Sequence, residues 1–247
     1  PYFPSLTAIE NSLGALRAFY ALGVRYMTLT HGGTIDWADS GTDEARHGGL
    51  TRFGEEVVRE MNRLGMLVDM SHVSPGSMSD VLNVAEAPVI FSHSSARALT
   101  NHPRNVPDSI LVRMPENGGV VMVTFVPSFI NEALRTYQGP PADAPRATLS
   151  DVADHIEHVR KVAGVDHVGI GSDFDGISSE PVGLKDVSTY PALFAELSRR
   201  GWTEGELRKL AGENLLRAWR EAESVARRLQ RERGPSTATF EELDGRR

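Results

Sequence analysis

Two histidines end two short apolar runs in the middle of the chain. His72 follows the run at residues 66–70 and His93 follows the run at residues 88–91, each directly preceded by a serine. Apolar runs of this length and composition are typical of buried parallel strands. Neutral imidazole is a good zinc ligand, and the tips of neighbouring parallel strands lie close enough to share an ion. The spacing therefore predicts that His72 and His93 are metal ligands.

The segment between the two histidines carries the signals of a helix. Ser74 is a candidate N-cap, Pro75 suits the first helical position, and the apolar spacing of residues 75–85 fits one helical face. Strand, helix and strand in this order form a parallel unit whose strand tips meet at one edge. The alternative interpretation is that both serines are helix N-caps and that the histidines only pack beside them.

Three further polar residues fall at related places. His31 ends another apolar run, Asp173 follows a third, and Arg104 lies in the loop after the second of the two histidines. A carboxylate at a strand end can bind a metal, act as a general base toward metal-bound water, or cap a loop. Arginine suits a two-pronged grip on a carboxylate. Taken singly, His31 would be an ordinary hydrogen-bonded residue and Arg104 an ordinary surface residue, and only the shared placement favours a site.

The remaining histidines fit structural or undefined roles. His155 and His158 are three residues apart on an amphipathic helix, where a solvated helix face is a better explanation than a metal site. His47 and His102 lie in loops and receive no role. His167 is expected to point away from the strand tips.

Strands alternate with helices along most of the chain. The predicted strands are at residues 26–31, 66–71, 88–92, 119–125 and 165–172. Strict alternation predicts a parallel α/β sheet with right-handed crossovers. An open doubly wound sheet usually has a glycine-rich phosphate turn after its first strand, and this sequence has none. We therefore favour a (β/α)8 barrel, whose site lies at the carboxyl ends of the strands; because a barrel needs eight strands, about three are missing.

Composition restricts the class of protein further. The chain has 247 residues, a formal net charge of −7 and no cysteine. The acidic balance argues against nucleic acid as a partner. No apolar run approaches the roughly 20 residues that span a bilayer. Without cysteine, disulfides are excluded, and His, Asp and Glu are the available metal ligands.

The domain and location predictions follow from the same data. We expect a single partial barrel domain across residues 1–247, ending in a surface tail at residues 232–247. With neither a signal peptide nor disulfides visible, a cytoplasmic enzyme is the expectation.

Several long segments match one known pattern. They are SLGALRAFYALGVRYMTLTH, GMLVDMSHVS, PVIFSHSSARAL, RNVPD, VADHIEHVRKVAGVDHVGIGSDFDG, and the run from DVSTYP to GWTEGEL. Together they resemble the renal or membrane dipeptidase family of zinc peptidases, within the amidohydrolase superfamily, from Ile9 to about Asp244. The resemblance implies a (β/α)8 barrel with two zinc ions that hydrolyses dipeptides, including those whose second residue has the D configuration. It also implies a homodimer.

The resemblance gives each candidate residue a role. His72 and His93 match metal ligands of the family. His31 matches a group near the scissile carbonyl that stabilises the developing oxyanion. Arg104 matches the residue that holds the substrate's terminal carboxylate, and Asp173 matches the residue that binds the substrate amine and moves protons.

Two parts of the family pattern have no counterpart in this sequence. The family has a His-x-Asp pair on an early strand and a glutamate that bridges the two metals just before the first matching helix. The opening PYFPSLT contains neither, and Glu10 matches a helix residue rather than the bridging one. We therefore expect the chain to hold the carboxyl-terminal five strands of the barrel.

Three functions remain open on these grounds. The favoured one is a metallo-dipeptidase that uses a water activated by two zinc ions. Another amidohydrolase, such as a deacylase of N-acyl amino acids, is the alternative among enzymes. From a different class, the chain could be a truncated, non-catalytic scaffold that keeps only the His72 and His93 corner and binds metal weakly.

Overall fold

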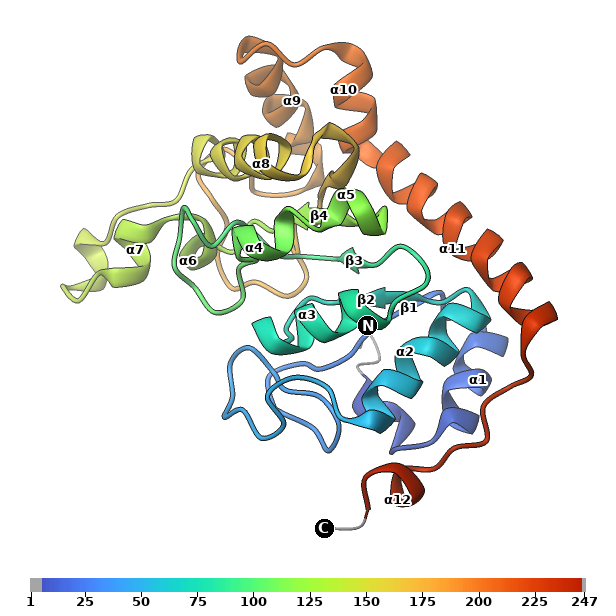
Figure 1. The fold of residues 1–247 in the computed structure, drawn as a ribbon. Helices are drawn as coiled ribbons and strands as arrows, with labels where there is room; N and C mark the ends of the chain where they lie inside the picture. The colour runs from blue at the N-terminus through green and yellow to red at the C-terminus, as the bar shows by residue number, and fades with distance from the viewer. Residues whose placement is uncertain (1–5, 246–247) are drawn as a thin grey trace. The chain divides into compact units, whose positions relative to one another are not determined.

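The computed structural model describes residues 6–245, which form helices alternating with five short strands (Figure 1). These residues divide into two units. The first holds the described residues up to Phe91, Glu116–Gly119, and the described residues from Leu216 onward. The second holds Ser92–Pro115 and Val120–Leu215.

The first unit is built on three parallel strands. Its strands are β1 (Tyr26–Thr28), β2 (Leu67–Asp69) and β3 (Ile90–Phe91), and its helices are α1 (Leu13–Ala21), α2 (Arg52–Leu64), α3 (Pro75–Val84) and α12 (Phe240–Leu243), preceded by a 3-10 turn at Leu6–Ile9. Strand β2 pairs with β1 through Val68 and Met27, and with β3 through Asp69 and Ile90. The parallel arrangement predicted for this part of the chain is confirmed.

The second unit pairs two more parallel strands and surrounds them with helices. Its strands are β4 (Val120–Val123) and β5 (Val168–Ile170); its helices are α4 (Asp108–Leu111), α6 (Pro127–Ile130), α7 (Glu132–Thr136), α8 (Leu149–Ala163), α9 (Tyr190–Arg199) and α10 (Glu204–Arg208). Short 3-10 turns lie at Pro141–Asp143, Val165–His167 and Val187–Thr189, and a π-helical turn lies at Lys209–Glu213. Two helices are divided between the units, α5 (Met114–Asn117) and α11 (Asn214–Glu232).

Local sequence explains where the helices begin and end. Ser74 caps α3, accepting a hydrogen bond from Ser77 N as its position before Pro75 predicted. Helix α2 ends at Gly65, whose φ of 84° is the left-handed conformation that glycine adopts without strain.

Two stretches contain only short helices. Residues 107–117 form two helices rather than one, because Pro115 has no N–H to continue the hydrogen-bond ladder. Residues 126–148 contain α6 and α7. A parallel α/β fold is confirmed by the strand pairings, and the (β/α)8 barrel stays a prediction.

Residues after α11 are held along the first unit. Arg17 Nη1 donates to the Ser236 carbonyl at 3.0 Å, and the N–H of Phe53 donates to Asp244 Oδ2 at 2.8 Å. The ring of Phe240 meets the ring of Phe53 edge-on, with 5.8 Å between centroids. The described part of the predicted tail is therefore an anchored segment that caps the start of α2.

None of the helices described in residues 6–245 combines the length and the apolar character needed to cross a membrane.

Candidate active site

His31 and His72 lie together in the first unit. Their ring centroids are 4.3 Å apart and their planes are inclined by 26°, which is a stacked arrangement. His31 follows β1 by three residues and His72 follows β2 by three, and these strands pair with Thr28 opposite Asp69. Equal spacing from paired parallel strand ends explains why the two rings meet.

The backbone at His72 is held in an unusual conformation. Its φ of 74° lies in the left-handed region, which costs a residue other than glycine roughly 1 kcal/mol. The His72 carbonyl accepts hydrogen bonds from Gly41 N at 2.7 Å and from Ser40 Oγ at 3.3 Å. Ser40 Oγ also lies 3.0 Å from the His31 carbonyl oxygen. One buried hydroxyl thus links the backbones of both histidines.

Asp39 organises the loop that carries Ser40. Its fully buried carboxylate accepts hydrogen bonds from the N–H groups of Arg46 at 2.8 Å, His47 at 3.1 Å and Gly49 at 3.0 Å. The segment from residue 32 to residue 50 is therefore an ordered loop. No role was predicted for Asp39, and the signal available in the sequence was that this loop is too long for a simple connection between a strand and a helix.

A second buried carboxylate lies at the end of β2. Asp69 accepts hydrogen bonds from Thr28 Oγ1 at 2.6 Å and from Ser71 N at 2.9 Å. Burial, and secondly the charge of Asp69, raise the pKa of Tyr26 to about 12. The strand ends that present His31 and His72 are thus tied to each other by a side-chain hydrogen bond.

His93 and Arg104 lie together in the second unit. Ser92 Oγ is 2.6 Å from His93 Nδ1; with Nδ1–H as the donor, Nε2 carries the lone pair that a metal ligand needs. Arg104 is 7% exposed, and its Nη2 donates to the His93 carbonyl at 3.4 Å. The arginine predicted to bind substrate is therefore a buried residue beside a predicted metal ligand.

An aromatic ring and a neutral imidazole support Arg104. The guanidinium carbon lies 5.4 Å from the centroid of Phe129, and the Phe129 ring stacks on His102 at 4.0 Å. His102 Nδ1 accepts a hydrogen bond from the Arg104 N–H at 3.2 Å. Burial, followed by the charge of Arg104, lowers the pKa of His102 to about 4, so the ring is neutral and able to accept. Neither Phe129 nor His102 was assigned a role from the sequence.

Asp173 follows β5 in the same unit and also has a left-handed backbone, with φ 63°. Gly176 packs against its carboxylate: a Cβ at Gly176 would lie 2.4 Å from Asp173 Oδ1. Gly171 packs against the segment that leads to His93, because a Cβ there would lie 1.9 Å from the Ser92 carbonyl oxygen. The glycines of GIGSDFDG therefore allow close approach around Asp173.

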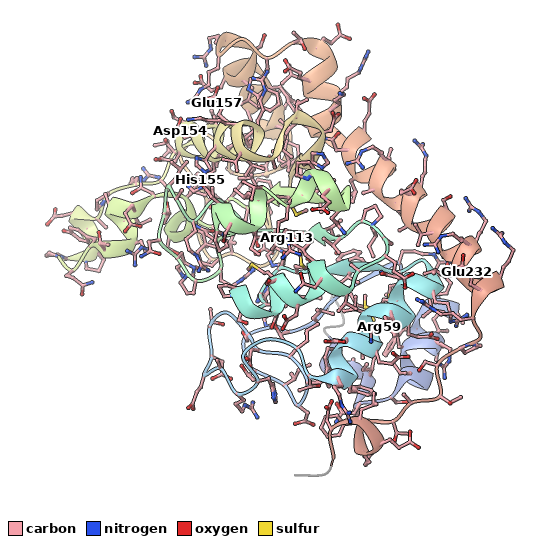
Figure 2. All side chains as sticks on the ribbon, in the orientation of Figure 1. Arg59, Arg113, Asp154, His155, Glu157 and Glu232 are labelled. Atoms are coloured by element: carbon pink, nitrogen blue, oxygen red, sulfur yellow. The ribbon has the colours of Figure 1, made fainter. Side chains whose placement is uncertain are left out.

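His155 differs from its prediction. It lies on α8 (Figure 2) but is 1% exposed, so the solvated face predicted for it is wrong. Its Nδ1 accepts from Ala96 N at 3.0 Å, and its Nε2 lies 3.2 Å from the Ile130 carbonyl oxygen. Burial lowers its pKa to about 4. The signal missed was that His155 shares the apolar stripe of Val152 and Val159.

Neutral imidazoles suit zinc, but the described residues supply only part of a ligand set. In residues 6–245, no three His, Asp or Glu side chains gather closely enough to hold a metal ion. His72 and His93 belong to different units, so each unit carries one of the two predicted ligands. Zinc sites in enzymes use about three protein ligands. The donor chemistry therefore fits zinc, and the number of donors falls short.

Residues 4–233 match the model of the membrane dipeptidase family, peptidase family M19. The probable dipeptidase PvdM from Pseudomonas aeruginosa is 30% identical with a TM-score of 0.81, over 88% of this chain and 67% of that one. A metallopeptidase from Rhodobacter sphaeroides, whose structure holds a phosphinate mimic of L-Ala-D-Ala, is 31% identical with a TM-score of 0.74, over 85% of this chain and 59% of that one. An amidohydrolase from Burkholderia multivorans, at 14% identity and a TM-score of 0.53 over 84% of this chain and 69% of that one, shares the fold.

Proposed function

Because the chain belongs to the membrane dipeptidase family, peptidase family M19, we propose that it hydrolyses the peptide bond of dipeptides, including L-Xaa-D-Xaa pairs, with a water activated by two zinc ions. The dipeptide mimic bound to the Rhodobacter sphaeroides enzyme supports this substrate class. The observation that carries the proposal is the stacked pair of His31 and His72 at paired strand ends. The chain spans 59% of the length of that relative, so the proposal concerns the complete protein.

His72 and His93 are the residues that would hold metal, each as a neutral imidazole. When bound, the metal supplies a water of lowered pKa as the nucleophile. The family's His-x-Asp pair and bridging glutamate have no counterpart in residues 6–245, so the proposal needs further ligands from outside this range.

Three residues would act on the substrate. The buried guanidinium of Arg104 holds the terminal carboxylate of the dipeptide by two parallel hydrogen bonds. The Asp173 carboxylate binds the free amine and carries the proton to the leaving nitrogen. The His31 ring donates a hydrogen bond to the oxygen that becomes negative during attack.

A substrate panel tests the proposal. The complete protein, loaded with zinc and checked by elemental analysis, is assayed with L-Ala-D-Ala, L-Ala-L-Ala and N-acetyl-D-alanine. We expect turnover of the dipeptides and none of the acetylated amino acid, because Asp173 requires a free amine. Turnover of N-acetyl-D-alanine alone would support a deacylase, and a fully metallated protein that cleaves none of these compounds would contradict both.

One observation favours a second candidate, a non-catalytic metal-binding remnant. The described residues contain no complete metal site. A remnant of this kind binds at most one zinc ion weakly, whereas the dipeptidase requires two. Zinc titration of the 247-residue chain and of the complete protein by calorimetry separates the two candidates. Two tight sites in the complete protein would rule out the remnant.

We also propose a cellular location and an oligomeric state for the protein. A cytoplasmic location rests on the cysteine-free sequence. A homodimer rests on the family resemblance, and light scattering of the purified complete protein tests it.

A further inference from the structure

Tyr190 contacts both sequence neighbours of Asp173. Its hydroxyl donates to Ser172 Oγ at 2.8 Å. Its ring stacks on the ring of Phe174, with 6.1 Å between centroids and 26° between planes. Asp173 lies between these two partners with a φ of 63°, a conformation that surrounding contacts must hold in place. One side chain therefore contacts the side chains on both sides of the candidate catalytic carboxylate.

The ring of Phe125 connects Tyr190 and Phe174 to the end of strand β4. Phe125 follows β4 and is fully buried. Its ring meets Phe174 edge-on at 5.5 Å and Tyr190 edge-on at 6.0 Å. Its backbone N–H also donates to the Ser172 carbonyl at 3.2 Å. Phe125, Phe174 and Tyr190 thus form an aromatic cluster around the base of the Asp173 turn.

Tyr190 itself stands on a well-anchored helix. It is the first residue of α9, and the end of that helix is tied to α8 by Arg200. Arg200 Nη1 bonds to Asp154 Oδ1 at 2.6 Å and to Glu157 Oε2 at 2.7 Å, and both acids are seen on α8 in Figure 2. A residue on a rigid helix can position its partners more closely than a residue in a loop.

The same contacts close a long loop at its base. The chain leaves β5 after Ile170, passes Ser172, runs through the segment at residues 175–189, and returns at Tyr190. Because Tyr190 binds both Ser172 and Phe174, motion of the exposed part of this loop need not reach Asp173.

We propose that Tyr190 is a positioning residue for Asp173, with its hydroxyl and its ring together fixing the direction of that carboxylate. The inference rests on the proposed function, in which Asp173 binds the substrate amine and moves protons. A tyrosine that only filled space would affect stability without changing turnover by the folded, metal-loaded enzyme.

Two single variants and their combination test the hydrogen bond. Tyr190→Phe keeps the ring and removes the donor, and Ser172→Ala removes the acceptor. In the zinc-loaded complete protein, we expect each to lower kcat about tenfold with a smaller change in KM. The double variant should lose no more than either single variant, because all three lack the same bond. Losses that multiply, or an unchanged kcat in Tyr190→Phe, would overturn the proposal.

Tyr137→Phe is the matched control, because it removes a tyrosine hydroxyl at the end of α7 in the same unit. It should leave kcat unchanged, and metal content is measured for every variant.

Hydrogen exchange tests the inference independently of turnover. The amides of residues 172–176 should exchange at least several-fold faster in Tyr190→Phe than in the wild type, since the turn loses one of its anchors. If the wild type hydrolyses no dipeptide, the proposed function fails while this measurement still decides the role of Tyr190. Unchanged exchange in that segment would refute the positioning role.

Discussion

Ser40 bonds to the carbonyl oxygen of His72 at 3.3 Å, and Gly41 N bonds to the same oxygen at 2.7 Å. This carbonyl belongs to a histidine with φ 74°, so the loop from residue 32 to residue 50 holds His72 in a conformation that it would not adopt alone. Because Ser40 Oγ also reaches His31, the stacked imidazoles depend on a residue outside both strands.

Ser40→Ala should loosen this pair. The substitution removes the hydroxyl that donates to the carbonyl oxygens of His31 and His72. We therefore expect the free energy of unfolding to fall by about 1–2 kcal/mol in urea titrations. The ring resonances of His31 and His72 in NMR spectra should shift, because the stacked geometry changes. Ser178→Ala, at an exposed position, serves as the control. Histidine resonances identical to the wild type would contradict the assignment.

Gly176→Ala should displace the Asp173 carboxylate. The new Cβ would lie 2.4 Å from Asp173 Oδ1, and a carboxylate can swing away whereas a backbone cannot. We expect kcat of the complete enzyme to fall about tenfold or more, with a stability change below about 1 kcal/mol. Gly205→Ala, where nothing lies within 4 Å, is the matched control and should keep full activity. A fully active Gly176→Ala enzyme would argue against a catalytic Asp173.

Gly171→Ala should displace backbone rather than a side chain. Here the Cβ would lie 1.9 Å from the carbonyl oxygen of Ser92, which is backbone. The segment leading to His93 must move, so we expect loss of stability of about 2 kcal/mol or more and loss of metal binding. Denaturant titration and elemental analysis measure the two effects. Retention of both would show that the sheet yields more easily than its packing indicates.

His155 should make the protein sensitive to mild acid. Its folded pKa, about 4, lies below the ordinary value of 6.5, so the unfolded chain binds the extra proton first. The stability contributed by the neutral ring is complete above about pH 6.5 and is lost as the pH falls toward about 4. Between pH 7 and pH 5 we expect a loss of about 2 kcal/mol in unfolding free energy.

His155→Gln is the control for that titration, since glutamine keeps a donor and an acceptor without a proton to gain. The stability difference between pH 7 and pH 5 should shrink in this variant. An equal difference in variant and wild type would mean that another group dominates the acid response.

Arg104→Lys should damage substrate binding more than turnover. Lysine keeps the charge but cannot form two parallel hydrogen bonds with a carboxylate, so KM for a dipeptide should rise about tenfold, with a smaller fall in kcat. Arg97→Lys is the control from the same loop, where the arginine bonds to the Pro103 carbonyl. A kcat defect at unchanged KM would assign Arg104 a different role.

Periodicity and strand spacing were enough to predict part of the site. The apolar runs located the five strands of residues 6–245, and the shared position of His31 and His72 after parallel strands follows from spacing alone. Those features are local, because a strand and its next few residues are fixed by short-range pattern.

The supporting residues could not be predicted in the same way. Ser40, Phe129 and Tyr190 act through contacts with segments distant in sequence, and a loop pattern contains no information about its partners. His155 is an intermediate case. The sequence shows that His155 lies on the apolar stripe of its helix. A histidine at that position could equally face solvent at the edge of the stripe, and only the contact with Ala96 in a distant loop decides that it is buried.

The cap that Asp244 places on α2 has a consequence for synthesis of the protein. The two residues that it joins, Phe53 and Asp244, are 191 positions apart, and Phe240 packs on the same phenylalanine. The second unit has all of its residues once Leu215 is made, whereas the first lacks this cap until Asp244 is made. On a growing chain, all residues of the second unit are therefore present before the cap on α2 can form, and the first unit completes this contact only after Asp244 emerges.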